Sequence, residues 1–409
     1  MTITNRRGLM LGAGAAALAL PGVSLAQAVA GFTPQGVTKL NAGLQAQVDA
    51  GKLAGIVTLL SHKGRVVNVN AYGRRDATAP DPVAPDTIFR IASMTKPVAG
   101  VAMMQLWEQG KWRLDDPVAK HIPEFAGLKV KTKAGGLEDQ KSPMTMAQVM
   151  SHTAGFGVSA VYGQAGLQDG DLADMIAKLA RLPLESQPGT DWAYGQVVNI
   201  QGYLVEKLSG KPLDVYFKDH IFGPLKMDDT GFWVEPSKAS RVAPIHTFDP
   251  TGKLVVAPNA RVQTSKPKFL SGSGGLSSTA PDYHRFCLAL LRGGALDGAR
   301  ILKPETVKLM RRSVLEPGVG VDLYGPVQTG VGFGMDFAVN ERPEISGLPY
   351  GRDTYWWGGA FGTWFWIDPT HEVIFVGMIQ NLNGSTPWGG TPDVRGQSAR
   401  DVYAAMGRA

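Results

Sequence analysis

The stretch "RIASMTKPVAG", Arg90 to Gly100, places a serine and a lysine three residues apart and follows them at once with a proline. Proline has no amide hydrogen and clashes inside a helix, so Pro97 is tolerated only in a first helical turn. A helix is therefore expected to begin close to Ser93. Helical spacing then places Lys96 one turn along, on the same face as Ser93.

This arrangement favours serine chemistry. The positive end of the helix dipole and burial both disfavour an ammonium, so both lower the pKa of Lys96. A neutral amine can take the proton of Ser93, a poor nucleophile without such a base. Backbone amides of the same turn can bind an oxyanion. Taken alone, the pair is equally compatible with a serine N-cap beside a lysine that reaches the surface.

A second Ser-x-x-Lys pair occurs at Ser265 and Lys268, in "SKPKFLSGSGG". Pro267 and the glycines that follow predict a loop. In a loop the lysine has no fixed relation to the serine, so only the first pair is a candidate site.

Hydrophobic patterns predict regular structure at both ends of the chain. Helices are expected over residues 34–50 and 395–407, and an all-round apolar helix from Pro97 to Gln109. Strand patterns occur in three places: a hairpin that reverses at His62-Lys63-Gly64, the run "GVGFGMDFAV", and "GTWFWIDPTHEVIFVGMIQ" with a turn at Asp368 to His371. Between them lie helical patterns and loops with few clear strands.

These elements predict an α+β fold interrupted by a helical insertion. The expected division is an α/β sheet domain from residues 29–112 and 271–409, with a mainly helical domain from residues 113–270.

The N-terminus is typical of an export signal. Residues 1–28 contain Arg6-Arg7, a twelve-residue apolar run from Leu9 to Leu20 and an Ala-Gln-Ala ending. The paired arginines resemble a twin-arginine signal, which predicts a periplasmic or secreted protein. The alternative is a cytoplasmic protein with an apolar terminus. Beyond this segment no run of 18 apolar residues occurs, so no membrane span is expected.

Composition excludes several classes of function. The 409 residues are 44% hydrophobic and 19% charged, with a formal charge of +6 that falls to +4 if the two arginines of the signal are removed. This weak bias does not indicate a nucleic-acid partner. Cys287 is the only cysteine and His-Glu-x-x-His is absent, so neither a disulfide, a metal nor a cofactor is expected.

Further motifs follow the serine and lysine in order: "GKWRLDDPVAKHIPEF", "MSHTAGF", "PGTDWAYGQ", "IFGPLKMDDTGFW", "GSGGLSSTAPDY" and "WWGGAFGTWFWIDP". In order and spacing they resemble the serine β-lactamase-like superfamily, and within it class C β-lactamases and especially family VIII carboxylesterases. The resemblance covers nearly all of residues 35–405. It implies the β-lactamase/transpeptidase-like fold, a central antiparallel sheet flanked by helices.

The resemblance also implies roles for single residues. Ser93 would be the acylated nucleophile, Lys96 its base, and Tyr194 in "WAYGQ" a proton relay. A phenol of ordinary pKa near 10 relays protons only if a cation stabilises its anion, and Lys96 is the expected cation. The alternative for Tyr194 is a buried tyrosine with a satisfied hydroxyl. The amides of Ser93 and Ala360 would form the oxyanion hole.

Two departures from the β-lactamase pattern affect substrate binding. Gln196 stands where the Tyr-x-Asn motif has asparagine, and Trp357-Gly358-Gly359 stands where β-lactamases have Lys-Thr-Gly. Losing that lysine removes the cation that binds the carboxylate of penicillins. Trp357 offers an apolar wall in its place, or is a core aromatic, and the two glycines permit close backbone approach to a substrate. Gln196, Trp357, Gly358 and Gly359 are therefore the predicted substrate-binding residues.

The sequence thus predicts a carboxylesterase that acts on small-molecule esters of small or medium acyl chain, as a monomer or small homo-oligomer. The alternatives are a β-lactamase or D-peptidase, a penicillin-binding-like sensor without turnover, and an acyltransferase. Four aromatic residues are expected to line the pocket: Phe156, Tyr162, Trp233 and Phe361. Three cations are candidates to replace the missing lysine: Arg261, Lys266 and Lys268. His152 is the alternative base, although a structural role is favoured.

Overall fold

The computed structural model describes residues 31–157, 160–258, 260–322, 326–382 and 391–407. The predicted signal, residues 1–28, lies outside the described residues. Within them, no helix combines the length and the apolar character needed to cross a membrane.

The centre of the molecule is a seven-stranded antiparallel sheet in the order β11-β12-β13-β14-β15-β1-β2. Its strands are β1 (Gly55–His62), β2 (Arg65–Gly73), β11 (Val331–Phe333), β12 (Ala338–Asn340), β13 (Tyr355–Gly358), β14 (Trp364–Asp368) and β15 (Val373–Met378). Strands from both ends of the chain meet at the β15–β1 pair, so the predicted antiparallel sheet is confirmed.

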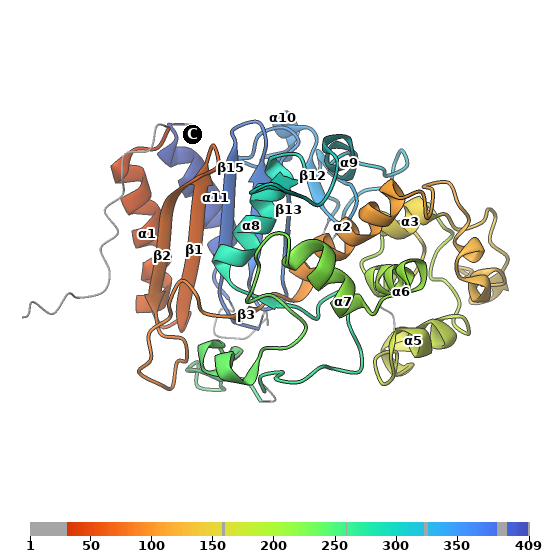
Figure 1. The fold of residues 1–409 in the computed structure, drawn as a ribbon, viewed down its shortest axis with the longest axis horizontal. Coiled ribbons are helices and arrows are strands. Elements are labelled where there is room, and N and C mark those ends of the chain that lie inside the picture. Colours follow the sequence, from red (N-terminus) through yellow and green to blue (C-terminus); the bar gives the residue numbers. More distant parts are fainter. Residues whose placement is uncertain (1–30, 158–159, 259, 323–325, 383–390, 408–409) are drawn as a thin grey trace, which may run out of the picture.

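Side chains alternate between the two faces of this sheet, as the period of two in a strand requires. Ile56 and Leu60 of β1 pack on one face, while Val57 and Leu59 pack on the other. The first face is covered by α1 (Pro34–Asp49) and α11 (Val394–Ala405), and α8 (Ala280–Leu291) packs on the second (Figure 1). Both faces are therefore buried, which explains why β14 and β15 are almost wholly apolar. In β1 the polar residues Thr58, Ser61 and His62 are buried as well.

The turns of the sheet follow their sequence signals. Lys63 and Gly64, with φ of 51° and 71°, join β1 to β2 at the predicted place, because a two-residue hairpin turn of this kind needs positive φ at both positions. The turn at Asp368 to His371 between β14 and β15 is also confirmed, and the Asp368 carboxylate accepts the amides of Thr370 and His371.

The stretch "GVGFGMDFAV" is not one strand but two. It forms β11 and β12, which reverse direction through Gly334 to Phe337, where the amide of Gly334 donates to the carbonyl of Phe337. Asp336 has a φ of 64°. That left-handed conformation ends a strand. Because apolar residues stand on either side of Asp336, the sequence pattern gave no clear sign of this turn.

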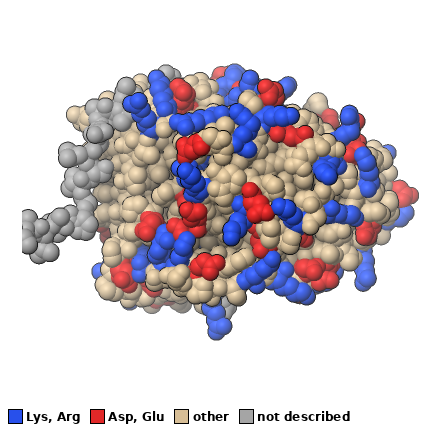
Figure 2. Space-filling view, in the orientation of Figure 1, with Lys and Arg blue, Asp and Glu red and all other residues tan. Residues whose placement is uncertain are grey.

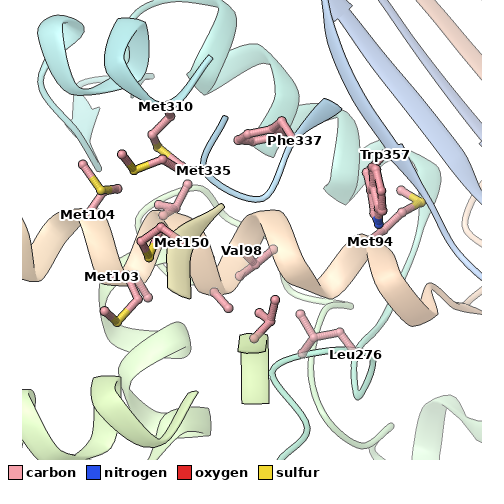
Figure 3. Packing of buried hydrophobic residues seen from close by; sticks show 14 of the residues in the cluster. Met94, Val98, Met103, Met104, Met150, Leu276, Met310, Met335, Phe337 and Trp357 are labelled. Carbon is pink, nitrogen blue, oxygen red and sulfur yellow. The ribbon is translucent and has the colours of Figure 1, made fainter. Parts of the chain in front are cut away.

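Helix α2 (Thr95–Glu108) lies between the sheet and the helical part of the molecule and is buried on nearly all sides, as expected. Methionines and aromatic rings surround it (Figure 3). The main cluster of buried apolar side chains extends from Val57 of β1 through α2 to Phe217 of α7 (Leu213–Phe217). This cluster is continuous, and the proposed division at residues 113 and 270 stays a prediction.

The remaining helices are α3 (Met146–Met150), α4 (Ala160–Gln164), α5 (Leu172–Leu179), α6 (Val197–Ser209), α7 (Leu213–Phe217), α9 (Pro304–Met310) and α10 (Pro343–Ser346). The remaining strands are the short pairs β3 (Phe89–Arg90) with β8 (Ser277–Ser278), β4 (Val130–Lys131) with β5 (Leu137–Glu138), β6 (His246–Phe248) with β7 (Leu254–Val256), and β9 (Ala295–Leu296) with β10 (Ala299–Arg300). On the face shown in Figure 2, positive and negative side chains are interspersed, in keeping with the small net charge.

Candidate active site

Ser93 lies in a single 3₁₀ turn, η1 (Ala92–Met94), that leads directly into α2, with Pro97 as the third residue of the helix. This is the helix start that Pro97 predicted. Ala92, immediately before the serine, has a φ of 44°. A left-handed alanine costs about 1 kcal/mol, and such strain is concentrated at functional sites.

Lys96, the second residue of α2, is buried one turn beyond Ser93, with 3% of its surface exposed. Its Nζ lies 3.1 Å from Oγ of Ser93 and donates to the carbonyl of Ser273 at 2.7 Å. Burial lowers the pKa of Lys96 to about 7, and the carboxylate of Asp336 opposes this shift. A large fraction of the amine is therefore neutral at pH 7 and able to accept a proton from the serine.

Tyr194 contacts the same serine hydroxyl as Lys96 does. Its phenol is hydrogen-bonded to Ser93 and accepts the indole N–H of Trp357 at 3.2 Å. Nζ of Lys96 lies 4.4 Å from the centre of the Tyr194 ring. The amine therefore lies against the Tyr194 ring, and its predicted stabilisation of a tyrosinate stays a prediction.

The ionisation of Tyr194 follows from its surroundings. Burial raises its pKa to about 12, while the hydrogen bonds from Ser93 and Trp357 and the charge of Arg395 oppose this shift. At neutral pH the phenol thus keeps its proton and can donate it to a departing oxygen.

Trp357 is more than the expected apolar wall. It is 5% exposed and packs against Tyr194 and Phe333, and its indole N–H donates a hydrogen bond to the Tyr194 hydroxyl. A buried indole needs such a partner. The tryptophan therefore holds the Tyr194 oxygen beside Ser93.

A cavity of about 300 Å³ opens over these residues. It is lined by Ser93, Tyr194, Val321, Gln328, Ala338, Tyr350, Trp356, Trp357, Gly358, Gly359, Ala360, Trp364, Phe365 and Arg395. Ser93 and Ala360, the two residues whose amides are the expected oxyanion donors, face the same space. Trp357, Gly358 and Gly359 also line it, which fits their predicted contact with substrate.

The two glycines serve the protein's own packing as well. A Cβ on Gly359 would lie 2.3 Å from the carbonyl oxygen of Ile91, and one on Gly358 would lie 2.6 Å from Nη1 of Arg395. Glycine therefore lets the end of β13 reach the serine turn. Close approach was predicted toward a substrate, but here it is toward neighbouring backbone and a guanidinium.

Arg395, on α11, was missed from the sequence. Its Nη2 donates to the carbonyls of Gly359 at 2.6 Å and Thr363 at 3.2 Å, so it clamps the turn that carries Ala360. It also brings a positive charge to the cavity lining. No local signal marks it, because one arginine at the start of a helix is an ordinary surface feature.

Gln196 does not reach the cavity, against expectation. It precedes α6, and its Oε1 accepts from the side-chain amide of Asn199. The buried Asn199 in turn accepts from the hydroxyl of Ser271 and the amide of Ser273. Asn199 thereby fixes the loop whose carbonyl binds Lys96. The longer glutamine side chain is used to hold Asn199 and makes no hydrogen bond to the backbone of the helix start.

The four predicted lining aromatics lie elsewhere. Phe156 and Tyr162 are buried against each other, and the Tyr162 hydroxyl donates to the carbonyl of Pro183. Trp233 lines a different cavity, and Phe361 is not among the residues around Ser93. Nearness in sequence to a motif did not predict nearness in space.

The three candidate cations are also outside the cavity. Lys266 pairs with Asp214 at 2.8 Å, and the amine of Lys268 lies 3.7 Å from Asp174. Arg261 is exposed, and its carbonyl accepts from Arg90. Arg395 of α11 supplies a positive charge to the cavity instead.

His152 has the structural position that was favoured. It is fully buried at a φ of 62°, stacks on Tyr194 with ring centres 5.5 Å apart, and places Nε2 3.1 Å from Asp336. Burial, and then the charge of Lys96, lower its pKa well below the ordinary value. It is a neutral support behind the tyrosine.

A serine at a helix start, a buried lysine one turn on and a tyrosine on the same hydroxyl, beside an antiparallel sheet, define an enzyme of the serine β-lactamase-like hydrolase class. The model of the Beta-lactamase family matches residues 40–397, and the chain belongs to this family. The predicted β-lactamase/transpeptidase-like fold is thereby confirmed.

Relatives include both esterases and a protein without a stated activity. The chain is 36% identical to Protein Rv1367c of Mycobacterium tuberculosis, over 83% of this chain and 89% of that protein. It is 30% identical to Esterase EstB of Burkholderia gladioli, over 77% and 83%. The solved structure of "EstCE1, a hydrolase with promiscuous acyltransferase activity" matches with a TM-score of 0.75 and 26% identity, over 90% and 99%.

Proposed function

We propose that this enzyme hydrolyses carboxylic esters of small or medium acyl chain through an acyl-enzyme on Ser93. The observation that carries the proposal is the 3.1 Å contact between Oγ of Ser93 and an amine whose pKa burial lowers to about 7. That contact supplies what a serine nucleophile needs, a neutral base within hydrogen-bond distance.

In the first step, Oγ of Ser93 attacks the ester carbonyl carbon and its proton passes to Nζ of Lys96. The carbonyl oxygen becomes an oxyanion facing the amides of Ser93 and Ala360. The bond from carbon to the alcohol oxygen then breaks. Tyr194 gives its proton to that oxygen, and Lys96 reprotonates the tyrosine.

In the second step, water attacks the acyl carbon and loses a proton to the Tyr194 and Lys96 pair. The bond from carbon to Oγ breaks, Ser93 recovers its proton, and a carboxylic acid leaves. An alcohol in place of water would give acyl transfer, and EstCE1 is a hydrolase with promiscuous activity of that kind.

The shape of the site supports esters as substrates. Trp357 occupies the position where β-lactamases carry a lysine, and the lining is rich in aromatic rings: Tyr350, Trp356, Trp364 and Phe365. Burial of apolar acyl surface favours binding by roughly 25 cal/mol per Å². A space of about 300 Å³ suits a short or medium acyl group.

A second candidate is a β-lactamase or D-peptidase, and Arg395 is the observation that favours it. A guanidinium in the cavity lining can pair with a substrate carboxylate. Nη2 of Arg395 already donates to two backbone carbonyls, so fewer of its N–H groups remain to bind a substrate carboxylate.

The deciding experiment compares wild type with Ser93→Ala on p-nitrophenyl acetate, butyrate and octanoate and on a chromogenic cephalosporin. We expect ester turnover that the variant loses, slow cephalosporin cleavage, and an acyl adduct on the peptide of Ser93 by mass spectrometry. Fast cephalosporin cleavage would favour the β-lactamase. A stable adduct without turnover would favour the sensor, and ester turnover in the variant would remove Ser93 as nucleophile.

The twin-arginine-like segment supports export as part of the proposal. Cell fractionation of the full chain beside an Arg6→Lys, Arg7→Lys variant tests it, with retention of the variant in the cytoplasm as the expected result. Equal distribution of both proteins would contradict it.

A further inference from the structure

A buried carboxyl group lies behind the candidate active site and has no part in the steps above. Asp336 is fully buried in the tight turn between β11 and β12. The amide of Met335 donates to the carbonyl of Met310, which anchors this turn against the end of α9. A backbone hydrogen bond beside Asp336 thus ties the turn that carries the carboxyl group to α9.

The two oxygens of Asp336 have different surroundings. Oδ1 lies 3.1 Å from Nε2 of His152 and accepts from the side-chain amide of Gln201 at 3.2 Å. Oδ2 has no hydrogen-bond partner among the described residues. A buried carboxyl oxygen without a partner is costly, so its position needs a reason.

The unpartnered oxygen faces helix α2. A Cβ added to Gly100 would lie 2.7 Å from Oδ2, so only glycine allows the carboxyl group to come this close to the helix. Gly100 is one turn beyond Lys96, and residues four apart share a helix face. Oδ2 is therefore directed to the face of α2 that carries the lysine.

Few titratable groups surround Lys96 and Asp336. The titratable groups that face Lys96 or Asp336 come from three neighbouring segments: His152 after α3, Tyr194 before α6, and Ser93 on η1. His152 is neutral and Tyr194 keeps its proton, as their shifted pKa values require. Among the described residues of this cluster, Asp336 is the group that can supply a negative charge.

We propose that Asp336 is a positioning residue that stabilises the ammonium which Lys96 forms when it takes the proton of Ser93. This rests on the proposed function, in which Lys96 is the base. When it is ionised, Asp336 adds a charge to the two neutral contacts of the ammonium, Ser93 and the Ser273 carbonyl.

The charge of each group favours the charged form of the other, although burial opposes both charges. The carboxylate raises the pKa of Lys96 against burial, and the lysine charge lowers the pKa of Asp336, which burial holds well above its usual range. The two groups therefore titrate as a pair. An opposite charge at close range moves a pKa by about 1 to 3 units.

The test is Asp336→Asn, which keeps the shape and the acceptor atom but removes the charge. The pKa of Lys96 is read by NMR on protein labelled with ¹³Cε-lysine, the signal being assigned by its loss in Lys96→Met. We expect the titration to move to lower pH by about one unit or more. The acidic limb of kcat/KM for p-nitrophenyl butyrate should move the same way, and kcat should fall about tenfold because the base is weaker.

Two further variants separate charge from structure. Gln201→Met removes the donor that lowers the pKa of Asp336, so it should move the Lys96 titration in the same direction by a smaller amount. It also tests the proposal if Asp336→Asn fails to fold. Asp368→Asn, the same change at another fully buried carboxylate, should leave the titration in place.

An unchanged Lys96 titration in both Asp336→Asn and Gln201→Met would overturn the proposal, even if activity falls. The NMR measurement needs no substrate. If Ser93-dependent ester hydrolysis is absent but the titration moves, the proposed function fails while the coupling of the two groups stands.

Discussion

The two Ser-x-x-Lys pairs of this chain have the same spacing and opposite surroundings. Lys96 is 3% exposed and lies 3.1 Å from Ser93, at the start of a buried helix. The side chain of Lys268 is 69% exposed, and its amine lies 3.7 Å from Asp174, while Ser265 stands in an exposed loop. Only the first pair has a fixed geometry and a dry environment.

The difference shows that the Ser-x-x-Lys spacing alone does not make a catalytic pair. A helix fixes the distance between residues three apart, and burial removes the water that would keep a lysine charged. Four predictions test whether these two conditions separate the pairs.

The largest effect is expected at the serines. Ser93→Ala should lower kcat/KM for p-nitrophenyl butyrate by about a thousandfold or more, because the attacking atom is gone. Ser265→Ala should leave it unchanged. Steady-state kinetics on both variants measure this, and a large loss at Ser265 would break the distinction.

The lysines come next. Lys96→Met should reduce kcat by roughly 10²- to 10⁴-fold, the usual contribution of a general base. The matched change Lys268→Met alters only an exposed pair and should have no measurable effect on kcat. Equal losses of kcat in the two variants would show that Lys96 contributes only a positive charge and does not act as the base of Ser93.

The pH dependence should show the buried lysine directly. Because Lys96 must be neutral to accept a proton and its pKa is about 7, kcat/KM should fall as the pH drops below about 7. The decline should approach tenfold per unit for a single group. A flat profile from pH 8 to pH 5, over a range where the protein stays folded, would contradict the role of Lys96.

The smallest effect is expected at Trp357. Trp357→Phe removes the hydrogen bond to Tyr194, which is worth about 1 kcal/mol, so kcat should fall by a factor of about five. As a control, Trp366→Phe changes a fully buried tryptophan on the other face of the sheet and should lower Tm more than kcat. An unchanged kcat in Trp357→Phe would leave the tryptophan as an apolar wall.

Much of the fold follows from local rules. Pro97 marks the start of α2, Lys63 and Gly64 mark the first hairpin, and strand alternation marks the sheet. The run "GVGFGMDFAV" has strand character, as predicted, but its pattern did not show that Asp336 divides it into two strands, because an aspartate between apolar residues gives only a weak turn signal. The predicted aromatic lining was wrong for a related reason, since distance along the chain says little about distance in space.

The sequence by itself determined the pair that lies within one helical turn, Ser93 and Lys96, and the family, through the order of its motifs. Only the tertiary structure decided what surrounds that pair. Tyr194 and Trp357 are 163 residues apart yet share a hydrogen bond, and Asp336 and Arg395 reach the site from the sheet and the last helix. The physical reason is that helix geometry is set by neighbouring residues, whereas burial, charge and hydrogen bonding at the site depend on segments that meet only when the core closes.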